Sequence, residues 1–180
     1  DTWRWDGISW SQLSPGVTPP ARSRPAMTYD RVRRRVVMFG GFSGTGALGD
    51  TWEFDRVSGT WALVSAFGPP ARWGHELAYD ENRGRVVMFG GFDGGFLGDT
   101  WEWDGTSWTP VTGGTAPSAR ADFGMTFAQE SGLTMLYGGS SAAGTESDLW
   151  LYDGTYWFEM PADPDGPGAR SGHALMYGAE

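Results

Sequence analysis

Arginine returns at nearly equal intervals along the chain and has the clearest potential for binding chemistry. Ala-Arg pairs end at four positions, separated by 50, 48 and 50 residues: Arg22, Arg72, Arg120 and Arg170. A guanidinium carries five donors in a planar fork and can hold a carboxylate through two parallel hydrogen bonds. Four such groups could bind acidic groups of a partner. The structural alternative is that each arginine ties down the backbone or an acidic side chain, since it recurs in every unit.

Next to these arginines stand residues that differ from unit to unit, as binding residues commonly do. Arg24, Trp73 and Asp122 lie one or two positions after the first three repeat arginines. We therefore expect them to determine specificity more than the repeated arginines do. Phe96 is a further candidate, because it lies on a glycine-rich loop outside the repeated pattern. An exposed aromatic ring on such a loop can contact a protein or a sugar.

Histidine occurs only twice, as His75 and His173, each three residues after a repeat arginine. The equivalent positions in the other units hold Pro25 and Phe123, so the chain does not supply a ring of metal-binding histidines. We interpret both histidines as packing and hydrogen-bonding residues. The alternative role, a general base, needs a nucleophile or a substrate pocket, and the sequence shows neither.

Aspartate is frequent, but its spacing matches no calcium-binding loop of the D-x-D-x-D-G type. We assign four aspartates to the capping of turns by their side chains: Asp50, Asp99, Asp104 and Asp148. The alternative acidic site is the irregular loop Asp163-Pro164-Asp165-Gly166. Accordingly, the sequence predicts no catalytic residue, no metal ligand and no cofactor.

Composition narrows the classes of partner. The 13 basic residues are all Arg, and 13 against 22 acidic residues gives a net charge of -9, which disfavours nucleic acid. The absence of Cys excludes disulfides and thiolate metal sites. No apolar run approaches the roughly 18 residues of a membrane-spanning helix, and no signal peptide is recognised, so we expect no membrane partner. Exclusive use of Arg favours a bacterial source, and we expect a secreted or cell-surface protein.

A second repeated motif defines the structural elements. Asp1-Thr2-Trp3-Arg4-Trp5-Asp6 returns from positions 50, 99 and 148, a step of 49 each time. Glycine pairs at 40–41, 90–91 and 138–139 each follow an apolar run. Each unit therefore predicts four short strands: one after the Arg, the apolar run, the Asp-Thr-Trp segment, and a last strand with a single Trp. Asp-Gly pairs supply the positive φ of a tight hairpin before the last strand.

This order of apolar run, Gly-Gly, variable loop, Asp-led aromatic strand and downstream Trp resembles the kelch repeat. The resemblance implies a β-propeller whose four-stranded blades bury one another and whose loops bind partners. We therefore expect an all-β, kelch-type propeller with three complete blades, at about 20–63, 70–111 and 118–160. Partial blades would lie at 1–14 and 168–178, which gives 2 + 4 + 4 + 4 + 1 = 15 strands. The repeat arginines would start the innermost strands.

A propeller of this kind is expected to be a non-enzymatic binding or assembly module for a protein or glycan partner. Its predicted binding residues are Arg22, Arg24, Arg72, Trp73, Phe96, Arg120, Asp122 and Arg170. Open strand edges of the partial blades predict self-association. Two alternatives stay open: a carbohydrate-active or metal-dependent kelch enzyme, and a purely structural repeat or propeller fragment that self-assembles. Copper radical oxidases, which kelch propellers also resemble, need a Cys that this chain lacks.

Overall fold

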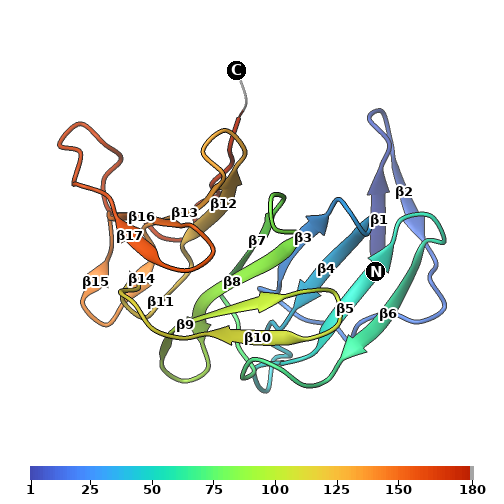
Figure 1. Ribbon diagram of the computed structural model, residues 1–180. Helices are drawn as coiled ribbons and strands as arrows, with labels where there is room; N and C mark the ends of the chain where they lie inside the picture. The colour runs from blue at the N-terminus through green and yellow to red at the C-terminus, as the bar shows by residue number, and fades with distance from the viewer. Residues whose placement is uncertain (179–180) are drawn as a thin grey trace.

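The computed structural model describes residues 1–178 and consists of antiparallel β-sheets without a helix in this range (Figure 1). The first sheet contains β3 (Ala26–Asp30), β4 (Arg35–Phe39), β5 (Thr51–Asp55) and β6 (Thr60–Ser65). The second contains β7 (Glu76–Asp80), β8 (Arg85–Phe92), β9 (Phe96–Trp103) and β10 (Trp108–Val111). The third contains β12 (Gly124–Ala128), β13 (Leu133–Tyr137), β16 (Leu149–Tyr152) and β17 (Trp157–Glu159).

Two smaller sheets accompany these three. A hairpin joins β1 (Thr2–Trp5) to β2 (Trp10–Leu13), and a small sheet is formed by β11 (Arg120–Ala121), β14 (Ser140–Ser141) and β15 (Gly144–Thr145). The prediction of an all-β chain is thus confirmed, and three of the antiparallel sheets contain four strands each. The described strands form five separate sheets, each with two edge strands. No helix in the part of the chain described here could span a membrane.

The strand that the sequence predicts within 168–178 is not observed among the described residues. Residues 160–178 contain no strand, and the 17 strands of the described chain include three short ones, β11, β14 and β15, that the sequence did not predict. A strand requires a neighbour that completes its hydrogen-bond ladder. Among the described residues no strand pairs with this segment through a hydrogen-bond ladder, so its apolar alternation alone does not make it a strand.

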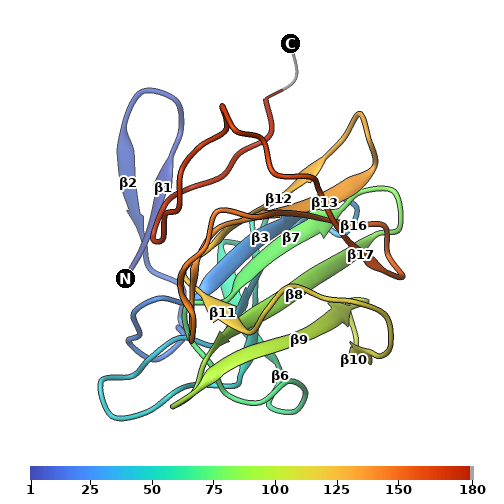
Figure 2. The same cartoon turned by 90° about the vertical axis from the view of Figure 1, so that its left-hand side faces the viewer.

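The sheets pack face to face because each has two apolar faces. Alternate side chains of a strand point to opposite sides, so Leu77 and Val86 face the first sheet while Ala78 and Val87 face the third. The first strands β3, β7 and β12 lie side by side, with β7 in the middle (Figure 2). We call them the inner strands. Their starts gather at one end of the molecule and their ends at the other.

A tryptophan of the fourth strand fastens each sheet to the preceding one. Trp108 Nε1 donates to Thr51 Oγ1 at 2.9 Å, and Trp157 Nε1 donates to Thr100 Oγ1 at 2.9 Å. Trp61 Nε1 makes the same bond to Thr2 Oγ1 of the β1–β2 hairpin, also at 2.9 Å. The hairpin therefore occupies the place that the outer two strands of a preceding sheet would take.

Arg34 is strained in the turn between β3 and β4, with φ +58°. The equivalent turns place Gly84 (φ +64°) and Gly132 (φ +71°) at this position, where a residue without Cβ has little steric cost. Arg34→Gly is therefore expected to raise the free energy of unfolding by about 1 kcal/mol in urea denaturation. Val32→Gly in the same turn is the control, because Val32 has no positive φ to relieve, and it should lower stability. An unchanged or lower stability of Arg34→Gly would contradict the strain argument.

Candidate functional site

Three of the four repeat arginines have buried side chains. Arg72 is fully buried, and its Nη1 and Nη2 donate to the two carboxylate oxygens of Asp99 at 2.6 and 2.8 Å. The same guanidinium donates to Gly90 O at 2.9 Å and to Pro70 O at 3.0 Å. The arrangement recurs in two further pairs, Arg22 with Asp50 and Arg120 with Asp148. These guanidinium groups donate their hydrogen bonds to acceptors of the same chain. This favours the structural alternative for Arg22, Arg72 and Arg120.

The aspartates of these pairs correct a prediction from the sequence. Asp50, Asp99 and Asp148 do not cap turns; each also accepts the indole N–H two residues later, as from Trp101 Nε1 to Asp99 at 2.6 Å. Sequence proximity suggested a local role, whereas the sheet brings in an arginine 27 or 28 residues earlier in the chain. Asp104 does cap its turn, accepting from the backbone N–H groups of Thr106 and Ser107 at 2.8 Å.

Charge balance keeps these partly exposed carboxylates ionised. Burial opposes ionisation of Asp99, but the hydrogen bonds from Arg72 and Trp101 and the charge of Arg72 outweigh it, so the pKa of Asp99 is lowered. The pKa values of Asp50 and Asp148 are lowered by the same balance with their own arginine and tryptophan. Each unit thus holds an Arg–Asp–Trp group that joins the start of its first strand to the start of its third.

The unit-specific residues Arg24, Trp73 and Asp122 are brought together at the start of the inner strands, one beside each sheet. Arg24 Nη2 donates to Asp122 Oδ2 at 2.9 Å, and the guanidinium carbon lies 4.6 Å from the centroid of the Trp73 ring. An ion pair and a cation–π contact therefore share one exposed guanidinium. We call these three residues the Arg24 cluster.

The backbone beneath the Arg24 cluster is strained. Four equivalent positions have left-handed φ values of +53° to +69°: Arg24, Gly74, Asp122 and Gly172. Hydrogen bonds link them in a row, from Gly74 N to Arg24 O, from Asp122 N to Gly74 O and from Gly172 N to Asp122 O. Glycine fits this conformation with least strain, whereas a side chain there costs about 1 kcal/mol or more. Arg24 and Asp122 occupy it despite that cost.

An aromatic row borders the Arg24 cluster. The Trp73 ring lies 6.2 Å from that of Phe42 and 5.1 Å from that of Phe92, and Phe92 lies 5.3 Å from Phe96, measured between centroids. All four rings are half-buried. Phe96 belongs to β9 and pairs with Phe92 across the β8–β9 hairpin, rather than lying on a free loop as the sequence suggested. Phe96 therefore extends the aromatic row instead of forming an isolated contact.

Glu76, at the start of β7, is a candidate that sequence reasoning missed. Burial, together with the negative charge of Asp122, raises the pKa of Glu76 to about 7. The equivalent positions hold Ala26 and Gly124. A comparison between units could have found it, since an ionisable group replaces two small residues in an apolar strand.

Glu76→Gln is expected to remove a pH dependence of stability. The folded-state pKa of about 7 lies above the ordinary value of 4.5, so between these pH values the native state binds more protons and its stability falls as pH rises. At pH 8 the Gln variant should be more stable than the wild type by about 1 to 3 kcal/mol in urea denaturation. Equal stability of the two proteins at pH 8 and pH 4 would contradict the assignment.

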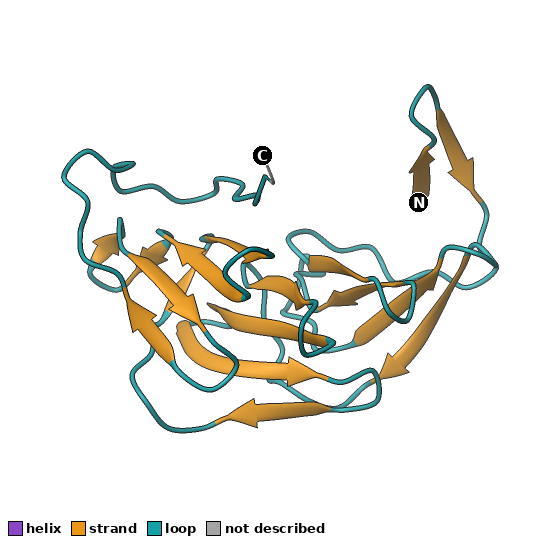
Figure 3. Ribbon diagram, turned by 45° about the horizontal axis from the view of Figure 1, so that its top comes forward, coloured by secondary structure: helices purple, strands orange, loops and turns teal. Residues whose placement is uncertain are grey.

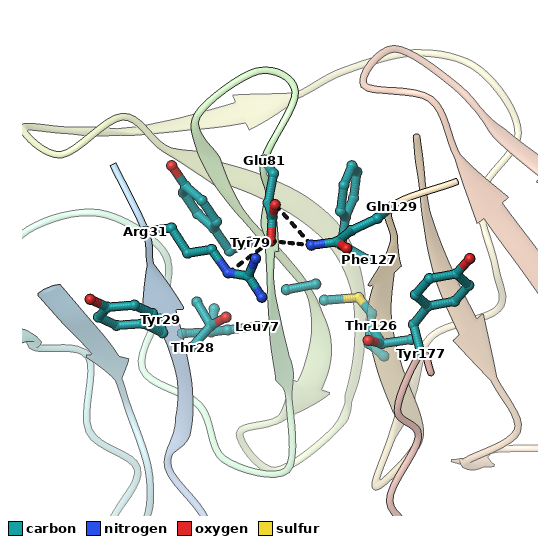
Figure 4. A pocket seen from close by; sticks show the side chains of 12 residues that line it. Thr28, Tyr29, Arg31, Leu77, Tyr79, Glu81, Thr126, Phe127, Gln129 and Tyr177 are labelled. Carbon is teal, nitrogen blue, oxygen red and sulfur yellow. Dashed lines mark hydrogen bonds and ion pairs between the residues drawn. The ribbon is translucent and has the colours of Figure 1, made fainter. Parts of the chain in front are cut away.

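At the opposite end of the inner strands lies a polar cleft of about 350 Å³ (Figure 4). Glu81 stands at its centre and accepts hydrogen bonds from Gln129 Nε2 at 3.0 Å on both oxygens. Arg31 Nε lies 3.0 Å from the same carboxylate. Tyr29 and Tyr177 stand on opposite sides of this group. We call this space the Glu81 cleft; the sequence did not predict it, because its polar residues come from three different turns.

The two histidines are packing residues at the junctions between units. His75 is buried and contacts Phe39 edge-on at 5.4 Å between ring centroids, and His173 contacts Tyr137 in the same way at 5.8 Å. Burial, aided by the positive charge of Arg72, lowers the pKa of His75 to about 3. His75 is therefore neutral near pH 7. Among residues 1–178, no three acidic or histidine side chains are grouped to hold a metal ion.

Arg170, the last repeat arginine, differs from the other three. Its side chain is exposed, and among the described residues its guanidinium donates only to Gly168 O, at 3.0 Å. The predicted binding residues thus fall into three groups. The first is the three buried arginines, and the second is the exposed Arg170. The third is the Arg24 cluster with Phe96 in the neighbouring aromatic row. No protein-family model and no curated protein matches this chain.

Proposed function

We propose that the chain is a non-enzymatic binding module with the architecture of a kelch-type β-propeller. The three four-stranded sheets would be successive blades, with β3, β7 and β12 as their innermost strands. Support comes from the repeated Arg–Asp–Trp groups, from the fourth-strand tryptophan bonds and from the face-to-face packing of the sheets. In such a scaffold the repeated residues build the fold, which leaves the unit-specific residues for recognition.

The Arg24 cluster is the observation that carries the proposed partner site. Arg24 and Asp122 hold a strained backbone conformation where the equivalent units have glycine. Strain of this kind persists where the surrounding structure holds it, and it is concentrated at functional sites. The cluster presents a cation, an anion and an aromatic face, and the cation contacts both of the others. These groups suit a protein partner, whose surface offers both charges and apolar contacts.

A combined Arg24→Gly, Trp73→Ala and Asp122→Gly variant tests this site. The two glycines match the residues found at the equivalent positions, so we expect the variant to fold with undiminished thermal stability. Screening against a phage-displayed peptide library and an immobilised glycan array should give binders for the wild type that the variant loses. A matched control carries Arg31→Ala and Glu81→Ala at the other end of the inner strands and should keep those binders. Equal binding by the triple variant would exclude the Arg24 cluster as the site.

A glycan is the second candidate partner, and the Glu81 cleft favours it. The charges of Arg31 and Glu81 cancel there, and the lining adds Thr28, Thr126 and tyrosine rings. Neutral hydroxyl groups both donate and accept hydrogen bonds, and an aromatic wall suits the apolar face of a sugar ring. On the glycan array, binding that is lost with Arg31→Ala and Glu81→Ala but kept in the triple variant would assign the glycan to this cleft.

A further inference from the structure

The guanidinium of Arg24 is held by fewer contacts than those of the buried repeat arginines. Its side chain is 51% exposed, and among the described residues it donates one hydrogen bond, from Nη2 to Asp122 Oδ2 at 2.9 Å. Arg72, by contrast, is fully buried and donates to both carboxylate oxygens of Asp99 and to two backbone carbonyls. An exposed ion pair contributes little free energy, because water and salt screen it. Arg24 can therefore leave its position at low cost.

The position that Arg24 fills has the chemistry of an arginine-binding site. Trp73 supplies an aromatic face, with the guanidinium carbon 4.6 Å from the ring centroid, and Asp122 supplies a carboxylate. An arginine stacks on an aromatic ring and pairs with a carboxylate better than a lysine does, because its guanidinium is planar and weakly hydrated. Gly74 leaves room beside this carboxylate, since a Cβ there would lie 2.8 Å from Asp122 Oδ1. No described group donates to Asp122 Oδ1, so this oxygen is available to a second donor.

A second carboxylate beside the Arg24 cluster leaves the site short of positive charge. Burial and, after it, the negative charge of Asp122 raise the pKa of Glu76 to about 7. Within residues 1–178 no arginine pairs with Glu76, so two carboxylates share the single charge of Arg24. The whole chain carries a net charge of -9, which attracts cationic partners and repels anionic ones. The electrostatics of the site therefore favour a cation.

The surroundings of this site suit a peptide segment better than a small ion. Arg24 lies in the loop before β3, and Asp122 lies between β11 and β12; Figure 3 shows the loops that connect the strands in teal. The aromatic row continues from Trp73, and its rings are half-buried. The aliphatic stem of a long cationic side chain packs well against such rings while its charged end reaches a carboxylate. A basic peptide therefore matches both the charge and the apolar surface next to it.

We propose that the Arg24 cluster binds a basic segment of a partner protein, one of whose arginine side chains displaces the guanidinium of Arg24 from Trp73 and Asp122. This inference rests on the proposed function, because it identifies the partner of the same site. Arg24 is then an internal competitor that fills the site while no partner is bound. Its guanidinium returns to water on displacement, and the partner gains contacts with the aromatic row and Glu76. An acidic partner would instead have to approach Arg24 beside two carboxylates that repel it.

Removal of the internal competitor tests this inference. The probe is dye-labelled hexa-arginine, and fluorescence anisotropy measures its dissociation constant with the full chain at pH 8, where Glu76 is ionised. Arg24→Gly should bind the probe about tenfold more tightly than the wild type, because the ion pair and the cation–π contact no longer compete. Arg34→Gly is the matched control and should bind like the wild type. Arg34 is also exposed, has a φ of +58° against +53° for Arg24, and its replacement removes the same charge.

Further variants and probes identify the contacts. Asp122→Asn keeps the size of the side chain and should weaken binding of hexa-arginine about tenfold, as should Trp73→Ala, since each removes one half of the site. Glu159→Gln removes an exposed carboxylate on β17 and should leave the affinity unchanged. Hexalysine has the same charge as hexa-arginine but should bind more weakly, because an ammonium group cannot stack or donate as a fork. Hexacitrulline, the neutral analogue, should not bind.

The outcomes distinguish this inference from the proposed function. Tighter binding by Arg24→Gly, together with weaker binding by Asp122→Asn and Trp73→Ala, supports the displacement of Arg24. The inference is wrong if Arg24→Gly binds hexa-arginine no more tightly than the wild type, or if Asp122→Asn binds it equally well. Equal affinities for hexalysine and hexa-arginine also overturn it. The proposed function fails on a separate result, namely that the triple variant keeps the binders selected from the peptide library and the glycan array.

Discussion

Arg72→Ala is expected to lower the free energy of unfolding by about 2 to 4 kcal/mol, because several hydrogen bonds to partly or fully buried groups are lost at once. The change removes a fully buried guanidinium and leaves the Asp99 carboxylate, whose side chain is 38% exposed, without its counter-ion. It also strips the carbonyls of Gly90 and Pro70 of their donor. A buried polar group that loses its hydrogen-bond partner costs more free energy than the intact hydrogen bond contributes. Urea denaturation at pH 7 measures the change.

Two further variants make the Arg72 prediction specific. Arg72→Lys keeps the charge but cannot make the two parallel bonds, so it should recover only part of the loss. Arg24→Ala removes an exposed arginine of the same length and should change stability by less than about 1 kcal/mol. If Arg72→Ala were no more destabilising than Arg24→Ala, the Arg–Asp–Trp group would not be a principal support of the fold.

Acid is expected to destabilise the protein through the same three ion pairs. Burial resists ionisation of Asp50, Asp99 and Asp148, but their arginines and tryptophans outweigh it and hold each pKa below the ordinary value of 3.8. A carboxyl whose folded pKa is depressed contributes stability above its unfolded pKa and loses it as pH falls through the folded value. Stability should therefore fall below about pH 4, by on the order of 1 kcal/mol for each pair after solvent screening.

Urea midpoints between pH 2 and pH 8 measure this dependence. The Glu76→Gln background is the clean one, because Glu76 makes stability fall as pH rises between 4.5 and about 7 and so opposes the trend. In that background, Asp99→Asn should be less stable at pH 7 and should lose less stability on acidification. An acid dependence that is identical with and without Asp99 would show that other carboxyls control the transition.

Much of the fold could be predicted from the sequence because its determinants are local and repeated. Apolar residues at alternate positions, such as Trp52 and Phe54, specify a strand. Asp104-Gly105 specifies the turn after the equivalent strand of the next unit. The 49-residue step of the Asp-Thr-Trp motif predicted a repetition of these elements, and the structure contains three four-stranded antiparallel sheets. The segment 168–178 shows the limit of this reasoning, because a strand also needs a neighbour with which to share hydrogen bonds.

The candidate site was predicted only in part. Comparison between units singled out Arg24, Trp73 and Asp122, because they depart from the repeat, and the structure brings them into contact. The same comparison could not show that Arg72 is paired with Asp99, nor that Glu76 lies near Asp122. Composition of a single unit does not reveal which side chains of the next unit will face it.

The sequence by itself determined the all-β class, the period, the order of strands in each unit and the turn at Asp104. These features rest on the intrinsic preferences of neighbouring residues, which act over a few positions of the chain. Only the tertiary structure decided which charges pair, which arginines are buried, and that Arg24 and Asp122 meet although 98 residues separate them. Such pairings depend on how one sheet stacks on the next, which places residues from different units within hydrogen-bond distance.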